Sequence, residues 1–283
     1  MQLLTAVRMG EMWVPQLARQ LATLDQMLDG RLTINIISSD IPGEVLGSGP
    51  RYQRTLEWMQ VLRTLLNGEP VRHRGEFLNL DLEPLRARTV SRECPPFYFG
   101  GFSEAAQETA AAAADVFLTW PDTVDAVGQT IREMDDRAAA HGRRLQYGLR
   151  SHVIVRESED DARDAAARLV SKLDDEIGRE IRQRWLDSAS VGVQRQAALR
   201  DASGADGFVE ENLWTGVGRV GSGAGAAIVG DPDHVLAKLE AYRAVGVGAF
   251  ILSGYPHLTE ADLFARHVLP RIEHGALPRV ASA

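Results

Sequence analysis

The sequence is short of the residues that several protein classes need. It has one cysteine, Cys94, in 283 residues, so an internal disulfide and a metal site built from several thiolates are both excluded, and we expect no metal. Lysine occurs only at Lys172 and Lys238. The remaining basic residues are arginines dispersed among an excess of acidic ones, and the net charge is −8. This pattern argues against a nucleic-acid partner.

Long apolar runs are also missing. Because no stretch of about 18 apolar residues occurs, we expect no transmembrane helix. The N-terminus does not have the charged and then apolar plan of a signal peptide, and we therefore expect a cytoplasmic protein. Hydrophobic residues make up 45% and charged residues 25% of the chain, which is the balance of a globular protein with a large core. We expect residues 1–283 to form a single domain.

Short apolar segments rich in β-branched or aromatic residues alternate with longer segments of helical periodicity. Strands are predicted at 3–7, 32–37, 97–99, 116–119, 147–155 and 249–253. Helices are predicted at 15–28, 52–66, 103–114, 122–141 (capped by Asp122), 160–173, from 232 onward, and at 260–272, while 68–92 reads as short strands and turns. Such alternation indicates an α/β protein with a parallel sheet and helices outside it.

The parallel sheet could be open and doubly wound, or closed into a barrel. An open nucleotide-binding sheet carries a glycine-rich turn directly after an early strand, but the loop after residues 3–7 contains only Gly10. A TIM barrel is therefore favoured, although the six predicted strands are two fewer than the eight of that fold.

Residues 174–225 interrupt the alternation and are interpreted as an insertion before the last strand, with a helix near 177–200. Their glycine-rich end, 216–225, lacks the lysine of a P-loop and does not follow a strand in a βαβ unit. A mobile lid over a site is the favoured interpretation. Arg219 would then reach an anionic ligand when the lid closes; a flexible connector with a solvated arginine is the alternative.

Arg150 and His152 lie two residues apart in the strand 147–155, so both side chains are expected on one face. An arginine and a histidine inside an apolar strand cost free energy unless they are paired or functional. Arg150 could hold an anion through two hydrogen bonds, and His152 could move a proton near neutral pH. The alternative is a buried salt bridge beside a hydrogen-bonded histidine.

Other polar residues follow other predicted strands, where a parallel barrel carries its chemistry. Asn35 and Ser38 suit the polar edge of a ring-shaped ligand, or plain turn chemistry. Gly101 and Ser103 lead a strand into a helix N-terminus, where free N–H groups favour a phosphate. Tyr255 follows the last strand on a glycine turn and is either an active-site residue or a packed one.

Five runs of the sequence, in order, resemble the alkanesulfonate monooxygenases of the bacterial luciferase-like superfamily. They are QLARQLATLDQMLDGRLTINIISSD, PPFYFGG, GLRSHVIVRE, NLWTGVGRVGSGAGAAIVGD and LSGYPHL, and the resemblance extends from Leu3 to about Leu269. It implies a TIM barrel with an insertion before the last strand region. It also implies that a separate NAD(P)H-dependent flavin reductase supplies reduced FMN and that O2 is consumed. The C–S bond of an alkanesulfonate or a similar organosulfur compound would be cleaved to sulfite and an aldehyde. Family members commonly form homo-oligomers, and the same is expected of this chain.

The resemblance implies roles for single residues as well. Arg150 and His152 match the family's Arg-x-His pair, so Arg150 would bind the sulfonate and His152 would assist proton transfer. The other matches are Tyr255 with an active-site tyrosine, Tyr52 and Ser103 with the FMN phosphate site, and Asn35 and Ser38 with residues beside the flavin ring.

The chain departs from the family pattern in three places. The family has about two further βα units, with an active-site cysteine and histidine, before the strand that matches residues 3–7. Without them two sheet edges and an apolar interior stay open, which predicts poor solubility or dependence on a partner. The family's lid arginine aligns with Gly221, so Arg219 would have to replace it. The loop 40–50 is shorter, so the substrate could be another sulfonate, a sulfone or a compound without sulfur. The absence of the first strands leaves a catalytically impaired flavin-binding remnant as a further alternative.

Overall fold

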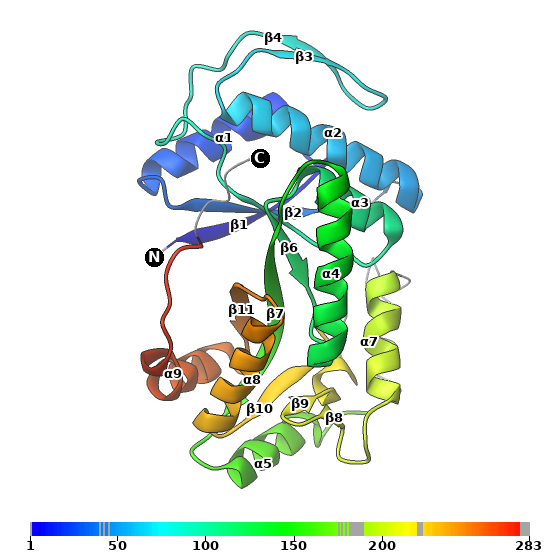
Figure 1. The fold of residues 1–283 in the computed structure, drawn as a ribbon, viewed down its shortest axis with the longest axis vertical. Coiled ribbons are helices and arrows are strands. Elements are labelled where there is room, and N and C mark those ends of the chain that lie inside the picture. The colour runs from blue at the N-terminus through cyan, green and yellow to red at the C-terminus, as the bar shows by residue number, and fades with distance from the viewer. Residues whose placement is uncertain are drawn as a thin grey trace.

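The computed structural model has a nine-stranded, mostly parallel sheet with helices packed against it (Figure 1). It describes residues 2–39, 41, 43–44, 46–174, 176, 178, 180, 190–219 and 223–277. The strands of the sheet are β1 (Leu3–Arg8), β2 (Leu32–Ile37), β5 (Phe97–Phe99), β6 (Val116–Thr119), β7 (Gln146–Val155), β8 (Phe208–Glu210), β9 (Leu213–Trp214), β10 (Ala227–Gly230) and β11 (Ala249–Ser253). Their order is β1-β2-β5-β6-β7-β10-β9-β8, with β11 paired to β7.

The helices follow the strands as the alternation predicts. They are α1 (Val14–Met27), α2 (Ser48–Leu66), α3 (Glu104–Ala113), α4 (Val124–Ala140), α5 (Glu159–Val170), α7 (Val191–Asp201), α8 (Pro232–Ala244) and α9 (His257–His267), with short 3₁₀ turns η1 (Gly216–Arg219) and η2 (Leu269–Arg271). A separate hairpin, β3 (Val71–Arg74) and β4 (Asn79–Leu82), accounts for the short strands expected in 68–92. No helix in the described part of the chain is long and apolar enough to cross a membrane.

All the strands that the alternation predicts are present, β8, β9 and β10 were not predicted, and the remaining differences concern the ends of elements. The last helix ends at His267 rather than at 272, and Pro270, which has no N–H to donate, falls in the turn that follows. Thr123, not Asp122, caps α4 by accepting the N–H of Ala126. Of the helix expected at 177–200, residues 178 and 180 and the helix α7 are described as helical, and residues 177, 179 and 181–189 lie outside the description.

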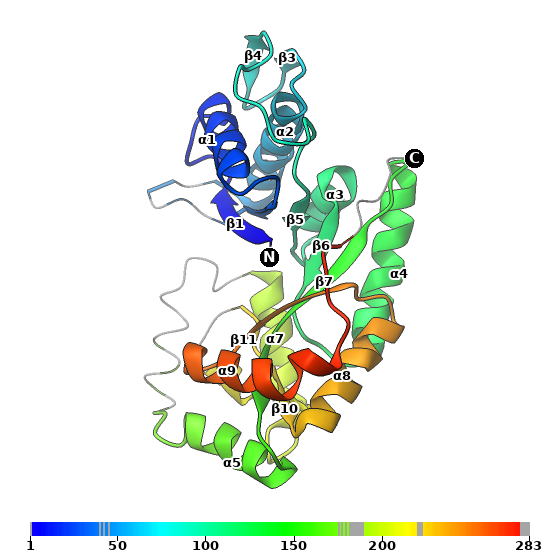
Figure 2. The same cartoon turned by 90° about the vertical axis from the view of Figure 1, so that its left-hand side faces the viewer.

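The sheet does not close into a ring within the described residues. β1 pairs only with β2, and β11 pairs only with β7. Figure 2 shows β1 with α1 and α2 in the upper half of the molecule and β11 with α9 in the lower half. Leu3 on the free edge of β1 is 40% exposed. The two open edges that the sequence predicts are therefore present.

The two faces of the sheet differ in chemistry. Ile34, Phe97 and Leu149 belong to the main hydrophobic core. The opposite, inner face carries Asn35, which is in register with Tyr98 of β5. Tyr98 is paired with Val116 of β6, and Val116 is paired with Gln146 at the start of β7, so all of them lie on the same face as Asn35. Because residues two apart share a face, Arg150 and His152 of β7 lie on this same inner face.

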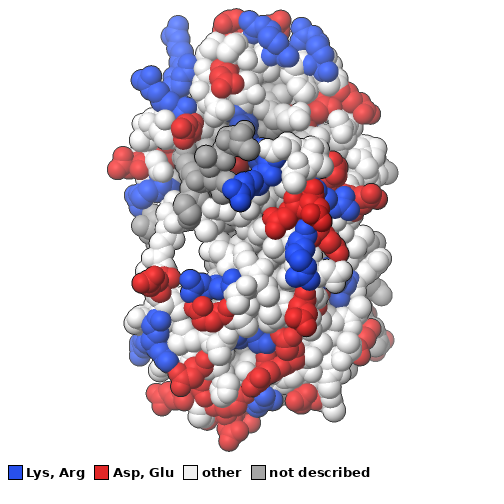
Figure 3. Space-filling view, in the orientation of Figure 1, with Lys and Arg blue, Asp and Glu red and all other residues white. Residues whose placement is uncertain are grey.

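Charges on the outer surface are mixed. On the side of the molecule in Figure 3, acidic and basic side chains are interspersed, and no extended basic area covers that side. Many of the exposed arginines lie beside carboxylates, as Arg72 lies beside Asp81 and Glu83. This distribution agrees with the dispersed charges of the sequence.

Gly100 directly follows β5 and packs closely against the backbone of β6, and a substitution there tests this packing. A Cβ atom at this position would lie 2.1 Å from the backbone oxygen of Leu118, and backbone cannot move aside cheaply. Gly100→Ala should therefore lower the free energy of unfolding by about 3 kcal/mol. Gly49→Ala is the matched control because nothing lies within 4 Å of its added Cβ. Urea unfolding measures both; equal midpoints for the two variants would contradict the packing described.

Candidate active site

The inner face of the sheet brings His152 and Tyr255 together, as the sequence predicts. Their ring centroids are 5.2 Å apart, with an angle of 35° between the planes. Tyr255 also meets His257 edge-on, at 4.9 Å between centroids. Ser253 of β11 is in register with His152, and its hydroxyl lies 3.0 Å from Nδ1 of His152. Ser253 and His257 were not among the residues expected here, although both stand in the LSGYPHL run.

Arg150 is half-buried on the same face and has no carboxylate within ion-pair distance among the described residues. This differs from the neighbouring Arg156, whose two terminal nitrogens donate to both oxygens of Glu260 at 3.0 and 2.7 Å. Among the described residues, Arg150 therefore does not form the buried salt bridge that was the alternative explanation. A half-buried guanidinium without an internal anion is suited to bind an anionic ligand.

Glu260 fixes the turn that carries Tyr255. Its side chain is 2% exposed and holds Arg156 at the end of β7. A Cβ atom at Gly254 would lie 2.5 Å from the Cβ of Glu260, so only glycine allows the turn to pass this close to α9. The turn thereby places the ring of Tyr255 against His152.

The environment of His152 keeps its imidazole neutral. His152 is 6% exposed, and burial is the main cause that lowers the pKa of its ring from 6.5 to about 4. The positive charges of Arg150 and His257 lower it further, while the backbone carbonyls of Ser253 and Ala224 act in the opposite direction. At neutral pH His152 therefore has one N–H to donate and one lone pair to accept a proton.

This neutral state predicts a pH-dependent stability. The pKa of His152 is lower in the folded state (about 4) than in the unfolded state (6.5), so the unfolded chain binds the proton more tightly. Folding stability should decrease by about 3 kcal/mol as the pH falls from about 6.5 to about 4, and His152→Gln should remove this part of the pH dependence. An NMR titration of the ring gives the folded pKa directly; a midpoint near 6.5 would contradict the prediction.

The turn between β5 and α3 brings together the residues expected to bind a phosphate. A Cβ atom at Gly101 would lie 2.6 Å from the Cβ of Ala106 and 3.5 Å from the hydroxyl oxygen of Tyr52, so the missing side chain leaves the turn open toward Tyr52. The hydroxyl of Ser103 caps α3 by accepting the N–H of Ala106 at 3.3 Å. Arg51 lies over the ring of Tyr52 at 5.4 Å and adds positive charge.

Asn35 and Ser38 occupy different positions. Asn35 is on the inner face, beside Tyr98. The hydroxyl of Ser38 forms a 2.7 Å hydrogen bond with that of Thr55 in α2, three residues after Tyr52. Ser38 thus links the end of β2 to the helix that carries Tyr52, and only Asn35 has a side chain on the face of Arg150 and His152.

Arg219 lies at the end of η1, and the cavity that it lines does not include Arg150, His152 or Tyr255. Val217 of η1 packs in one cluster with Ile154, which follows His152 by two residues on β7. Arg219 itself lines a cavity of about 610 Å³ that it shares with Arg163 of α5 and with Trp214. Gly221, which aligns with the lid arginine of the alkanesulfonate enzymes, lies with its two neighbours outside the described residues. The role of Arg219 at the substrate stays a prediction.

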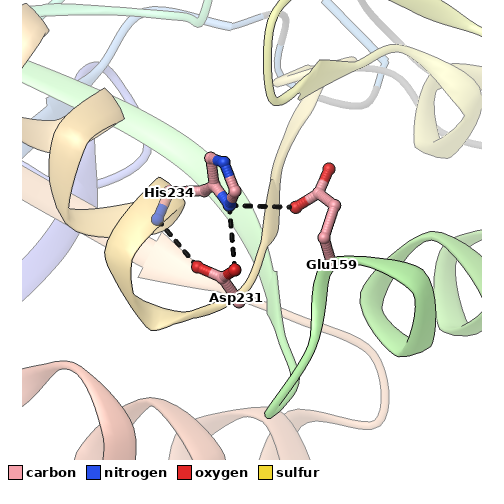
Figure 4. Close-up of side chains that lie close together, drawn as sticks. All are labelled: Glu159, Asp231 and His234. Atoms are coloured by element: carbon pink, nitrogen blue, oxygen red, sulfur yellow. Dashed lines mark hydrogen bonds and ion pairs between the residues drawn. The ribbon is translucent and has the colours of Figure 1, made fainter.

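Glu159, Asp231 and His234 form the one group of metal-ligand type among the described residues (Figure 4). Nδ1 of His234 is 3.0 Å from Asp231 and 3.4 Å from Glu159. Asp231 caps α8 by accepting the N–H groups of Asp233 and His234, and Glu159 already accepts a hydrogen bond from Arg163. The positive end of the α8 dipole also disfavours a cation here, so these side chains have structural roles and we assign no metal to them.

Two aromatic side chains, Phe102 and Trp120, lie together beyond the end of β6. The rings of Phe102 and Trp120 lie 5.9 Å apart, and Gly192 of α7 packs against both. The buried side chain of Gln196 donates to the carbonyl of Pro121 at 2.9 Å and accepts the N–H of Gly225 at 2.8 Å. The insertion is thereby fixed to the end of β6 where the candidate site lies.

Known proteins resemble the chain over almost its full length. Residues 1–249 match the family model of luciferase-like monooxygenases. The chain is 61% identical to a sulfoquinovose monooxygenase of Novosphingobium aromaticivorans, over 98% of this chain and 78% of that protein. It is 50% identical to a sulfoquinovose monooxygenase of Agrobacterium fabrum, over 97% of this chain and 72% of that protein. The EDTA monooxygenase of Chelativorans sp. BNC1 has the same fold, with a TM-score of 0.75, 17% identity, and 94% and 72% of the two chains covered.

These matches confirm the family and the TIM-barrel type that the sequence runs predict, and the alkanesulfonate monooxygenases are related members. The chain belongs to the luciferase-like monooxygenase family, whose members are flavin-dependent enzymes.

Proposed function

We propose that this chain uses reduced FMN and O2 to cleave the C–S bond of a sulfonated sugar of the sulfoquinovose type, releasing sulfite and an aldehyde. The observation that carries the proposal is Arg150, a half-buried guanidinium with no ion-pair partner among the described residues, beside the neutral imidazole of His152. Two relatives that share half or more of its residues are named for sulfoquinovose. They favour a sugar sulfonate over the simple alkanesulfonate that the sequence suggested.

The turn before α3 fits the phosphate of FMN. Gly101 leaves space that a side chain would fill, the hydroxyl of Tyr52 borders that space, and the N-terminus of the ten-residue helix α3 lies next to it. Backbone N–H groups at a helix N-terminus and a nearby hydroxyl are suitable donors for a phosphate. Asn35 on the inner face would bind the polar edge of the ring system. When bound, reduced FMN supplies the electrons that activate O2.

The side chains of this protein would bind, orient and protect the reactants. Arg150 would hold the sulfonate through two parallel hydrogen bonds and stabilise the negative charge of the departing sulfite. His152 would move a proton between its ring and the reacting oxygen, with Tyr255 stacked against it. Phe102 and Trp120 would keep water from the reacting atoms. The chemistry needs a reductase that takes electrons from NAD(P)H, and we propose that a separate protein in the cytoplasm provides it.

Sulfite release tests the proposal. The chain would be mixed with an NADH-dependent flavin reductase, FMN and sulfoquinovose in air, and sulfite would be measured by its reaction with a disulfide reagent. Sulfite formation that requires all components supports the proposal. Octanesulfonate and a long-chain alkane are tested separately as alternative substrates. Oxygenation of the alkane with no sulfite from either sulfonate would show that the chain acts on a compound without sulfur.

A further inference from the structure

Ser253 is the last residue of β11, and it meets His152 across two parallel strands that are in register at this position. Its hydroxyl oxygen is 3.0 Å from Nδ1 of His152. His152 is almost fully buried, whereas Ser253 is half-buried. Because both residues belong to paired strands of the central sheet, the backbone register places their side chains next to each other.

The partners of the imidazole determine which of its nitrogens carries the proton. A neutral imidazole has one N–H, which needs an acceptor, and one lone pair, which needs a donor. The backbone carbonyls of Ser253 and Ala224 interact with the ring, and a carbonyl can only accept. Among the described residues, the Ser253 hydroxyl is the hydrogen-bond partner of the ring that can donate. With the hydroxyl donating its hydrogen to the lone pair of Nδ1, the single ring proton is on Nε2.

We propose that Ser253 is a positioning residue of the active site: by donating its hydroxyl hydrogen to Nδ1, it holds His152 in the Nε2–H form and fixes the orientation of the ring. The consequence for catalysis rests on the proposed function, in which His152 moves a proton. Without this hydroxyl, the ring can rotate or shift its proton to Nδ1, where the backbone carbonyl of residue 253 would accept it. His152 would then present a lone pair in place of a donor to the reactants.

The first measurement is independent of catalysis. In protein labelled with ¹⁵N at histidine, the chemical shifts of the two ring nitrogens of His152 report the tautomer at pH 7. A protonated Nε2 and an unprotonated Nδ1 are expected in the wild type, and also in Ser253→Thr, which keeps the hydroxyl. Ser253→Ala should give a mixture or the opposite tautomer. A wild-type ring protonated on Nδ1, or identical spectra of the wild type and Ser253→Ala, would overturn the proposal.

Kinetics test whether the role is more than structural. Ser253→Ala should lower kcat about tenfold, the lower end for loss of such a supporting hydrogen bond, and change KM less than twofold. Ser253→Thr should stay within about twofold of the wild type. In a His152→Ala background, Ser253→Ala should cause no further loss, because it acts through His152. Losses that multiply in the double variant would overturn the proposal. If no variant releases sulfite, the proposed function fails, and the NMR result still decides the tautomer.

Discussion

Replacing Arg150 with alanine should reduce kcat/KM for sulfite release by roughly a hundredfold to a thousandfold. The guanidinium is half-buried on the inner face of β7 and has no internal anion among the described residues, so its interaction with a sulfonate is not weakened by a competing carboxylate. Removing one partner of a buried, charge-assisted pair costs about 3–4 kcal/mol, which corresponds to this loss in rate.

A conservative variant and a control distinguish binding of the sulfonate from the general effect of a lost charge. Arg150→Lys keeps the charge but cannot form two parallel hydrogen bonds, so its activity should lie between those of the wild type and Arg150→Ala. Arg72→Ala removes an arginine from the exposed hairpin strand β3, where the side chain is 52% exposed, and should leave kcat/KM unchanged. A value for Arg150→Ala within threefold of the wild type would remove Arg150 from the sulfonate site.

The position of Arg150 on the inner face could be predicted from the sequence because it depends on one strand alone. Period-two alternation in one apolar strand is enough to place Arg150 and His152 on the same face, and the register with β11 confirms that this face carries Ser253. In the same way, the spacing of apolar residues is enough to predict strands and helices. Features that depend on neighbours within one element are therefore readable from the sequence.

Features that depend on contacts between distant segments were missed. β10 was not predicted, because its four residues follow a glycine-rich stretch, and its pairing with the end of β7 is what defines it as a strand. The hydrogen bond of Ser253 to His152 joins residues 101 positions apart. A serine at a strand end is ordinary turn chemistry until the register of two strands is known.

Replacing Glu57 with alanine should cause the largest loss of stability among the variants considered. Glu57 lies in α2 with a side chain that is 4% exposed. Its carboxylate accepts the backbone N–H groups of Glu76, Phe77 and Leu78 at 2.9–3.0 Å and lies 3.3 Å from Nε2 of His73. One buried side chain thus fixes the turn between β3 and β4 to α2.

The loss should be about 3–5 kcal/mol for Glu57→Ala, since three backbone donors lose their charged acceptor. Glu57→Gln should lose less, about 2–3 kcal/mol, because the amide oxygen can still accept while its NH2 group faces donors. Glu76→Gln is the matched control, because it removes an exposed carboxylate from the same turn and should change stability by less than about 0.5 kcal/mol. Thermal and urea unfolding measure all three; equal midpoints for Glu57→Gln and Glu76→Gln would contradict this account.

The pH dependence identifies the charge as the cause. Burial alone would raise the pKa of Glu57, but the hydrogen bonds from Phe77 and Leu78, from His73 and from Glu76 together hold it below its usual 4.5. The stability that this carboxylate contributes is therefore complete above about pH 4.5 and is lost as the pH falls through the lower folded pKa. The difference between the wild type and Glu57→Gln should be constant from pH 7 to 5 and shrink below pH 4.5. The contribution of His152 is present in both proteins and cancels from this difference. A difference that stays constant down to pH 3 would show that the shape of the side chain, and not its charge, holds the hairpin.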